Sequence, residues 1–260
     1  MEPISEFEVT YLEHGIFKIM APPMRFHQYL VLGEGKALLI DSGFGMGSLK
    51  AVVDKLTDLP IVLINTHGHP DHGGGNAEFG RPLLHPADNE LYAQKCAYGS
   101  RLEEAKHWNI PDAAEQLQPT PEPPIPIEDG AEIELGGRRL TVIHTPGHTK
   151  GSISIFDEKT GYLFTGDNTM GNVTSLTEPS AATVSDYLRS MEKLLKLPAK
   201  AICTGHVPAV VEPKIMQDKL DCAKRILSGD MPETVHTPMG DALRMEVNGT
   251  AVHYRPDNVT

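Results

Sequence analysis

The chain has 260 residues, of which 40 % are hydrophobic, so it is long enough to bury one large core. Its formal net charge of -12 argues against a nucleic-acid backbone as the main partner, because phosphate binding needs clustered lysine and arginine. Three widely spaced cysteines argue against a disulfide framework and favour a reducing cytoplasm. The acidic N-terminus does not resemble a signal peptide, and no window reaches the length of a membrane-spanning helix, so we expect no membrane association.

The N-terminal part is predicted to alternate short strands with one helix. Apolar runs bounded by glycine or proline predict strands at 15–20, 28–32, 36–40 and 60–64, and apolar residues at helical spacing predict a helix over 46–56. Before this helix, the run from Gly43 to Gly47 is similar to a dinucleotide-binding fingerprint. Ser48 stands where that fingerprint has its third glycine, so we expect no nicotinamide or flavin cofactor.

The middle of the chain contains a helical insert followed by a proline-rich segment. Helices are expected over 86–98 and 101–117, which together form an insert of about 86–117. The segment QPTPEPPIPI at 118–127 holds five prolines, which exclude a helix and an interior strand. We interpret it as a linker within a single domain that covers residues 1–260. The insert is either a lid or pocket wall, or a set of surface helices that only cover a sheet.

The second half repeats the outline of the first. Strands are expected at 131–135, 139–144, 152–156, 162–165, 200–203, 243–247 and 251–254, and helices at 184–195 and 213–227. The residues 157–161 and Asn248-Gly249 are typical of hairpin turns. Two strand-rich halves, each with helices, indicate an α/β fold.

The strongest motif is the stretch THGHPDHGGG at 66–75, directly after a predicted buried strand. Its candidate ligands form the pattern H-x-H-x-D-H and are His67, His69, Asp71 and His72. Imidazole nitrogen and carboxylate oxygen are ligand types that divalent metals such as zinc accept. Pro70 and the glycines exclude a regular strand or an interior helix. We therefore expect a tight loop whose side chains serve two neighbouring metals.

Three further motifs carry a candidate ligand just after a short apolar run. His148 ends TPGH, Asp167 ends FTGD, and His206 ends TGH. Because loops at strand ends can converge on one edge of a sheet, these residues are candidates for the same metal centre.

In this order, the motifs resemble those of the metallo-β-lactamase superfamily, from Ile40-Asp41-Ser42-Gly43 to His206. The resemblance implies a four-layer αβ/βα sandwich, with two mixed β-sheets flanked by helices and the metals at one edge. It also implies that one metal is held by His67, His69 and His148, and the other by Asp71, His72 and His206, with Asp167 bridging both. Asp41 would support the site from outside the ligand set, although a strand-end aspartate capping a turn is the alternative.

The resemblance implies two divalent metal ions, with zinc as the first candidate and iron or manganese as alternatives. The ligand set carries only two negative charges, so the site with both metals bound would stay cationic. Such a site lowers the pKa of a bound water and holds a bridging hydroxide as the nucleophile near neutral pH. One metal would polarise the substrate carbonyl or phosphoryl oxygen while the other stabilises the leaving group. Asp71 would in addition accept a hydrogen bond from the hydroxide and orient it.

The type of residue at position 167 narrows the substrate class. A bridging aspartate there resembles glyoxalase II-type thioesterases, lactonases and phosphodiesterases more than true β-lactamases. After this motif the chain has no arginine or lysine before Arg189, which argues against the glutathione recognition of glyoxalase II. We therefore expect a cytoplasmic hydrolase that cleaves a small-molecule thioester, ester or lactone, and a homodimer on general grounds.

Two alternatives stay open at this stage. A phosphodiesterase or nuclease would use the same metals, although the acidic composition argues against a nucleic-acid substrate. A mononuclear-iron persulfide dioxygenase would keep the same motif residues and use fewer of them. His27, Tyr29, His107 and Trp108 are candidates for the pocket wall, whereas Cys203 is expected to be a small buried hydrophobe.

Overall fold

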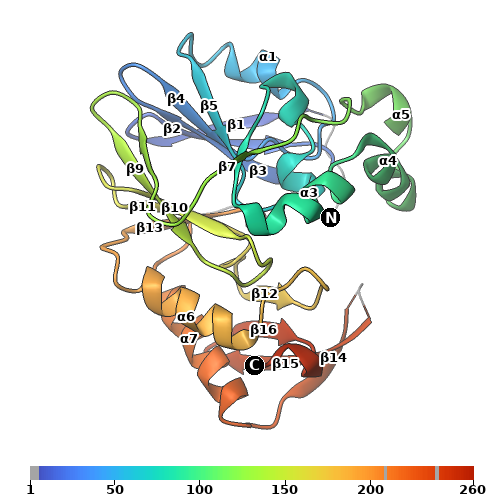
Figure 1. The fold of residues 1–260 in the computed structure, drawn as a ribbon, viewed down its shortest axis with the longest axis vertical. Coiled ribbons are helices and arrows are strands. Elements are labelled where there is room, and N and C mark those ends of the chain that lie inside the picture. The colour runs from blue at the N-terminus through green and yellow to red at the C-terminus, as the bar shows by residue number, and fades with distance from the viewer. Residues whose placement is uncertain (1–5, 208–209, 238–239) are drawn as a thin grey trace. The chain divides into compact units, whose positions relative to one another are not determined.

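The computed structural model describes residues 6–207, 210–237 and 240–260. The chain divides into two compact units, residues 1–140 and 141–260. Each unit builds its own sheets and its own core (Figure 1).

Unit 1 is built on a sheet of seven described strands in the sequential order β1 to β7. The pairs from β1 to β4 are antiparallel, and those from β4 to β7 are parallel. The strands are β1 (Glu8–Glu13), β2 (Ile16–Ala21), β3 (Phe26–Leu32), β4 (Ala37–Ile40), β5 (Ile61–Ile64), β6 (Leu83–Leu84) and β7 (Ile125–Pro126), and the unit also holds β8 (Glu132–Glu134).

The helices of unit 1 cover this sheet and form the insert. They are α1 (Leu49–Val53), α2 (Pro70–Gly73), α3 (Asn89–Lys95), α4 (Tyr98–His107) and α5 (Ala113–Gln116), with short 3-10 turns η1 (Asn76–Glu78) and η2 (Pro86–Asp88). Leu49 and Val53 of α1 pack on Leu30, Leu39 and Leu63, which are neighbours across the central strands. All four residues of β4 are buried, as expected for a strand covered on both faces.

Unit 2 contains two groups of strands. The order in the first is β13-β11-β10-β9, and the order in the second is β12-β16-β15-β14. The strands are β9 (Arg139–His144, which begins at the end of unit 1), β10 (Ile153–Asp157), β11 (Tyr162–Gly166), β12 (Val173–Leu176), β13 (Ala201–Thr204), β14 (Glu233–Thr237), β15 (Gly240–Val247) and β16 (Thr250–Tyr254).

Two long helices, α6 (Val184–Leu194) and α7 (Lys214–Leu227), pack together and supply the core of unit 2. Tyr187 and Met191 of α6 lie in one apolar cluster with Leu163, Ile202 and Val252 from the strands. A capping box between Thr183 and Asp186 starts α6, and the 3-10 turn η3 (Pro256–Asn258) follows the last strand. None of the described helices is long and apolar enough to cross a membrane.

Most predicted elements are present, with three informative differences. The strands β1, β7, β12 and β14 were not predicted. β1 and β14 contain no buried residue, β7 lies at the end of the proline-rich segment, and β12 is a four-residue strand that alternates partly buried and buried residues. The helix expected over 101–117 is divided, because Asn109 and Asp112 adopt left-handed φ values of 56° and 53° on either side of Pro111. The strands of the second half divide between two sheets, because β12 pairs with β16 and not with β11.

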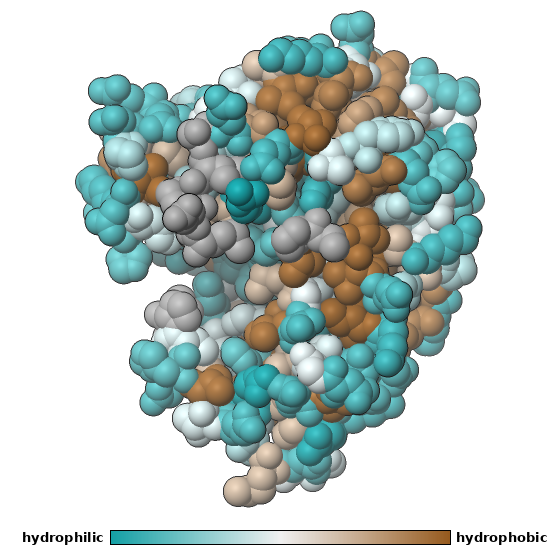
Figure 2. All heavy atoms as spheres, turned by 180° about the vertical axis from the view of Figure 1, so that it is seen from behind, coloured by the Kyte–Doolittle hydropathy of each residue, from teal (hydrophilic) through white to brown (hydrophobic). Residues whose placement is uncertain are grey.

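The surface combines hydrophilic residues with scattered apolar ones. Figure 2 shows apolar residues exposed among hydrophilic ones on the face that it draws. Among the described residues, Tyr11 and Met231 are the most exposed large hydrophobic side chains. Single exposed hydrophobic residues of this kind are normal for a folded protein and indicate no docking surface by themselves.

Lys219 on α7 predicts a measurable pH dependence of stability. Its side chain is fully buried and its Nζ donates a hydrogen bond to the carbonyl of Ala251, at 3.0 Å. Burial lowers its pKa from 10.5 to about 7, so above pH 7 the unfolded chain binds a proton that the folded chain lacks. We expect the free energy of unfolding to rise relative to a Lys219→Met variant between pH 7 and 8.5, by up to about 1.4 kcal/mol per pH unit.

The measurement is urea unfolding at a series of pH values, with Lys224→Met, an exposed lysine of the same helix, as the matched control. The control should follow the wild type at every pH. If the free energy of unfolding had the same pH dependence in the wild type and in Lys219→Met, Lys219 would not be neutral in the folded protein.

Candidate metal centre

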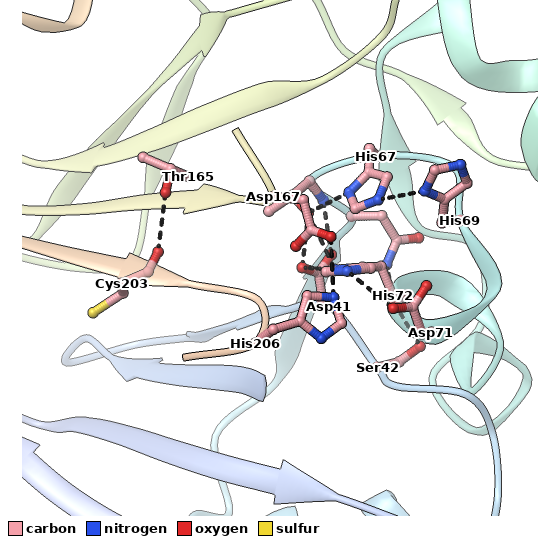
Figure 3. A network of polar contacts seen from close by, with 12 residues as sticks. Asp41, Ser42, His67, His69, Asp71, His72, Thr165, Asp167, Cys203 and His206 are labelled. Carbon is pink, nitrogen blue, oxygen red and sulfur yellow. Dashed lines mark hydrogen bonds and ion pairs between the residues drawn. The ribbon is translucent and has the colours of Figure 1, made fainter. Parts of the chain in front are cut away.

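The H-x-H-x-D-H motif lies at the end of β5 in unit 1, where the chain leaves the buried strand (Figure 3). His69 is the N-cap of α2, and Pro70 occupies the first helical position, where no backbone N–H is needed. This single helical turn lasts only to Gly73. His67 and His69 therefore precede the turn, whereas Asp71 and His72 belong to it.

Three imidazoles of the motif lie in one buried group. His67, His69 and His72 are 1 %, 6 % and 1 % exposed. The ring of His67 lies 4.8 Å from that of His69 and 4.0 Å from that of His72, measured between centroids. A neutral imidazole is the form that binds metals, and this buried group places several such rings side by side.

Asp41 fixes the orientation of this group from the end of β4. Its Oδ1 accepts the backbone N–H of Thr66 at 2.7 Å, and its Oδ2 accepts the Thr66 hydroxyl at 2.8 Å. The same Oδ2 lies 2.8 Å from Nδ1 of His72. An ionised carboxylate can only accept hydrogen bonds, so Nδ1 of His72 carries the proton and Nε2 carries the lone pair. Asp41 also adopts a left-handed φ of 63°, a strained conformation that this network holds in place.

The glycines near Asp41 are required by the close packing of two loops. A Cβ atom on Gly74 would lie 2.4 Å from the carbonyl oxygen of Phe44, and one on Gly75 would lie 2.4 Å from that of Ser42. A Cβ atom on Gly45 would similarly lie 2.5 Å from the carbonyl oxygen of Gly74. The run that resembles a dinucleotide fingerprint therefore packs against the loop of the metal motif.

Polar side chains outside the motif also hold this loop, and the sequence did not single them out. Asn65 donates from Nδ2 to the carbonyl of His72 at 3.0 Å, and the Ser42 hydroxyl donates to Oδ1 of Asn76 at 2.7 Å. Asn65 and Asn76 are fully buried and bonded to each other. The sequence carries no signal that could have identified them, because their burial is defined only by the folded chain.

The other three predicted ligands come together in unit 2. Asp167 follows β11 and His206 follows β13, and these strands are parallel neighbours, so both residues leave the same end of the sheet. Nε2 of His206 lies 3.0 Å from Oδ2 of Asp167, and Nε2 of His148 lies 3.7 Å from the same oxygen. His148 comes from the loop between β9 and β10.

The carbonyl of Ser175 on β12 orients His148. It lies 2.9 Å from Nδ1 of His148, and a carbonyl can only accept, so Nε2 again carries the lone pair. Asn168 accepts the backbone N–H of His148 at 2.8 Å. Neither Ser175 nor Asn168 was singled out from the sequence.

The donor geometry in each unit fits a divalent cation. In unit 2, the lone pair of His148 Nε2 faces a carboxylate oxygen of Asp167, and in unit 1 His72 Nε2 lies 3.6 Å from Oδ2 of Asp71. Two acceptors that face each other repel unless a proton or a cation lies between them. Imidazole nitrogens paired with carboxylate oxygens are also the ligand chemistry of zinc and of iron.

The predicted pocket residues occupy different surroundings. His27 and Tyr29, on β3, are 2 % and 4 % exposed. Trp108, at the end of α4, packs its ring 4.9 Å from that of Phe44, so the insert is tied to the loop that begins at Asp41. Cys203 is buried, as expected for a small hydrophobe, and its carbonyl accepts the Thr165 hydroxyl at 3.4 Å.

Comparison with known proteins identifies the family. The family model described as the metallo-beta-lactamase superfamily matches residues 27–206, and the chain belongs to this superfamily. Among curated proteins, the acyl-coenzyme A thioesterase MBLAC2 of Bos taurus is 29 % identical over 228 residues, which cover 76 % of this chain and 78 % of that protein.

Solved structures of the same superfamily share the fold. A metallo-beta-lactamase family protein of Thermus thermophilus, TTHA1429, has a TM-score of 0.62 at 23 % identity, covering 86 % of this chain and 85 % of that one. The protein TTHA1623, solved in a di-iron-bound form, has a TM-score of 0.60 at 26 % identity, covering 77 % and 96 %.

These matches confirm the predicted family and the α/β fold class with mixed sheets and helices. They also establish the chain as a metal-dependent hydrolase. Among the described residues, all seven predicted ligands belong to groups of His and Asp side chains that could hold a metal ion.

The Asp41 network generates a prediction about metal affinity. In the wild type, Oδ2 of Asp41 accepts hydrogen bonds from the Thr66 hydroxyl and from Nδ1–H of His72. In an Asp41→Asn variant, the amide Nδ2 would take the place of Oδ2, and it is itself a donor that cannot accept these bonds. Because outer partners of this kind orient the ligand, we expect a loss of about 10–100-fold in zinc affinity. The measurement is competition with a chromogenic chelator at fixed pH.

Asp54→Asn is the matched control, since Asp54 is exposed and pairs with Lys50 on the helix surface. It should leave zinc affinity unchanged. If Asp41→Asn bound zinc as tightly as this control, Asp41 would have no role in holding His72.

Proposed function

We propose that the chain hydrolyses an acyl thioester of the coenzyme A type at a dinuclear metal site. The observation that carries this proposal is the similarity to acyl-coenzyme A thioesterases over about three quarters of both chains, at 29 % identity. The two ligand groups support it, because all seven expected ligand positions hold the expected residue type.

In this proposal the ligand sets are those that the family resemblance implies. One metal would be held by His67, His69 and His148, the other by Asp71, His72 and His206, and Asp167 would be a ligand shared by both. When bound, the metals acidify a water molecule and polarise the thioester carbonyl. Zinc is our first choice, and the di-iron form of TTHA1623 makes iron the alternative to test.

The residues of the chain then divide the remaining tasks. The Asp71 side chain is 18 % exposed, against 3 % for Asp41 and 6 % for Asp167, so Asp71 is the carboxylate that can accept the hydrogen bond orienting the attacking water. Asp41 and the carbonyl of Ser175 keep Nδ1 of His72 and His148 protonated, so both rings present Nε2. The overall reaction consumes one water and gives a carboxylate, a thiol and a proton.

Further expectations complete the proposal. The substrate is a small molecule, neither a nucleic acid nor a membrane is required, and the protein is a homodimer of the cytoplasm. None of the three cysteines, all within the described part of the chain, forms a disulfide, which supports a reducing compartment.

The test is an assay of metal-loaded protein against acyl-coenzyme A thioesters of increasing chain length, with released thiol measured by a chromogenic disulfide reagent. A γ-lactone, a carboxylic ester and a bis-aryl phosphodiester are assayed beside them by acid release. We expect thioester cleavage to dominate and to fall at least about 1,000-fold in His69→Ala, because a missing ligand removes the charge that stabilises the transition state. His236→Ala is the control and should retain activity, because the His236 side chain is 85 % exposed on β14 and is no part of the proposed site.

Each other outcome assigns a different function. Faster turnover of the lactone or ester would move the substrate class within the same chemistry. Dominant phosphodiester cleavage, or oxygen uptake on a persulfide with one iron per chain, would refute thioester hydrolysis.

A further inference from the structure

Asn168 is a buried side chain of unit 2 that directly joins two loops carrying predicted ligands. It follows Asp167 in sequence, is fully buried, and lies between the end of β11 and the 145–148 loop. Its Oδ1 accepts the backbone N–H of His148 at 2.8 Å. Its Nδ2 donates to the backbone carbonyl of Thr145 and, at 3.2 Å, to the hydroxyl of the same residue.

The contacts around Asn168 hold its side-chain amide in one orientation. Its backbone carbonyl accepts the Tyr187 hydroxyl at 2.8 Å and the Thr174 hydroxyl at 3.0 Å, so the main chain is fixed from α6 and from β12. On the other side, a Cβ atom on Gly147 would lie 2.6 Å from Oδ1 of Asn168. The glycine is therefore needed for the loop to approach the amide this closely.

The same loop is also held by α6 and by the segment before this helix. Ser190 donates to the carbonyl of Pro146 at 2.7 Å, and the backbone N–H of Ala182 donates to the carbonyl of Gly147 at 2.9 Å. These bonds fix the path of the loop, but none of them reaches Asp167. The Asn168 amide joins the loop to the strand end that carries Asp167.

We propose that Asn168 is a positioning residue that sets the His148–Asp167 geometry and thereby the metal affinity of unit 2. The inference rests on the proposed function only in taking these two residues as ligands. Only a side chain with one acceptor and one donor on the same planar group satisfies both the His148 N–H and the Thr145 carbonyl. Removal of the amide leaves two buried backbone groups without partners and frees the His148 loop to move.

The test is zinc binding, measured by competition with a chelator, together with thermal unfolding of the metal-free protein. We expect Asn168→Ala to lose at least about 10-fold in zinc affinity, as outer-sphere substitutions typically do. Asn168→Asp keeps an acceptor for the His148 N–H, so it should recover part of that loss. His148→Ala provides the reference for a missing ligand.

Asp157→Ala is the matched control for stability. Asp157 is fully buried and bonds to Thr160 in the hairpin at the opposite end of β11. It should lower the unfolding temperature of the metal-free protein and leave the zinc affinity unchanged.

The possible results distinguish the role of Asn168 from the existence of the metal site. Unaltered zinc affinity in Asn168→Ala would overturn the positioning role, as would equal affinity losses in Asn168→Ala and Asn168→Asp. Absence of zinc binding in the wild type would refute the proposed metal site itself.

Discussion

The hydrogen bonds accepted by the Asp41 carboxylate are the constraint on which the metal motif of unit 1 depends. One side chain at the end of β4 accepts from the backbone and hydroxyl of Thr66 and from Nδ1 of His72. It therefore joins the ends of two adjacent parallel strands and fixes one ligand ring in a metal-binding tautomer. The strained φ of Asp41 and the crowded glycines are consequences of bringing these two loops so close.

In unit 2, different groups orient the candidate ligands and join their loops. A backbone carbonyl, that of Ser175, takes the place of a carboxylate beside the ligand ring, and an asparagine amide joins the loops. The parallel pairing of β11 with β13 brings Asp167 and His206 to one end of the sheet. In both units the ligands are thus loop residues whose freedom is removed by buried polar partners, which lowers the entropy lost on metal binding.

The sequence identified the candidate metal ligands but not the residues that hold these ligands in position. His67, His69, Asp71 and His72 form a dense motif, and its spacing carries the information. Asn65, Asn76 and Asn168 are single asparagines with no spacing signal, and their role depends on burial that only the folded chain defines. The same distinction applies to the fold. Buried apolar strands such as β4 and β5 were predicted, whereas the polar edge strand β1 and the break at Asn109 depend on pairing and on backbone conformation.

The proposed function requires that one pair of metal ions is held by ligands from both halves of the sequence. The most direct measurement is anomalous X-ray diffraction from crystals grown with zinc. We expect two anomalous peaks per chain about 3.5–4 Å apart, as in other two-metal sites, with Asp167 between them. A single peak, or two peaks whose ligands all come from the H-x-H-x-D-H motif, would contradict the shared site.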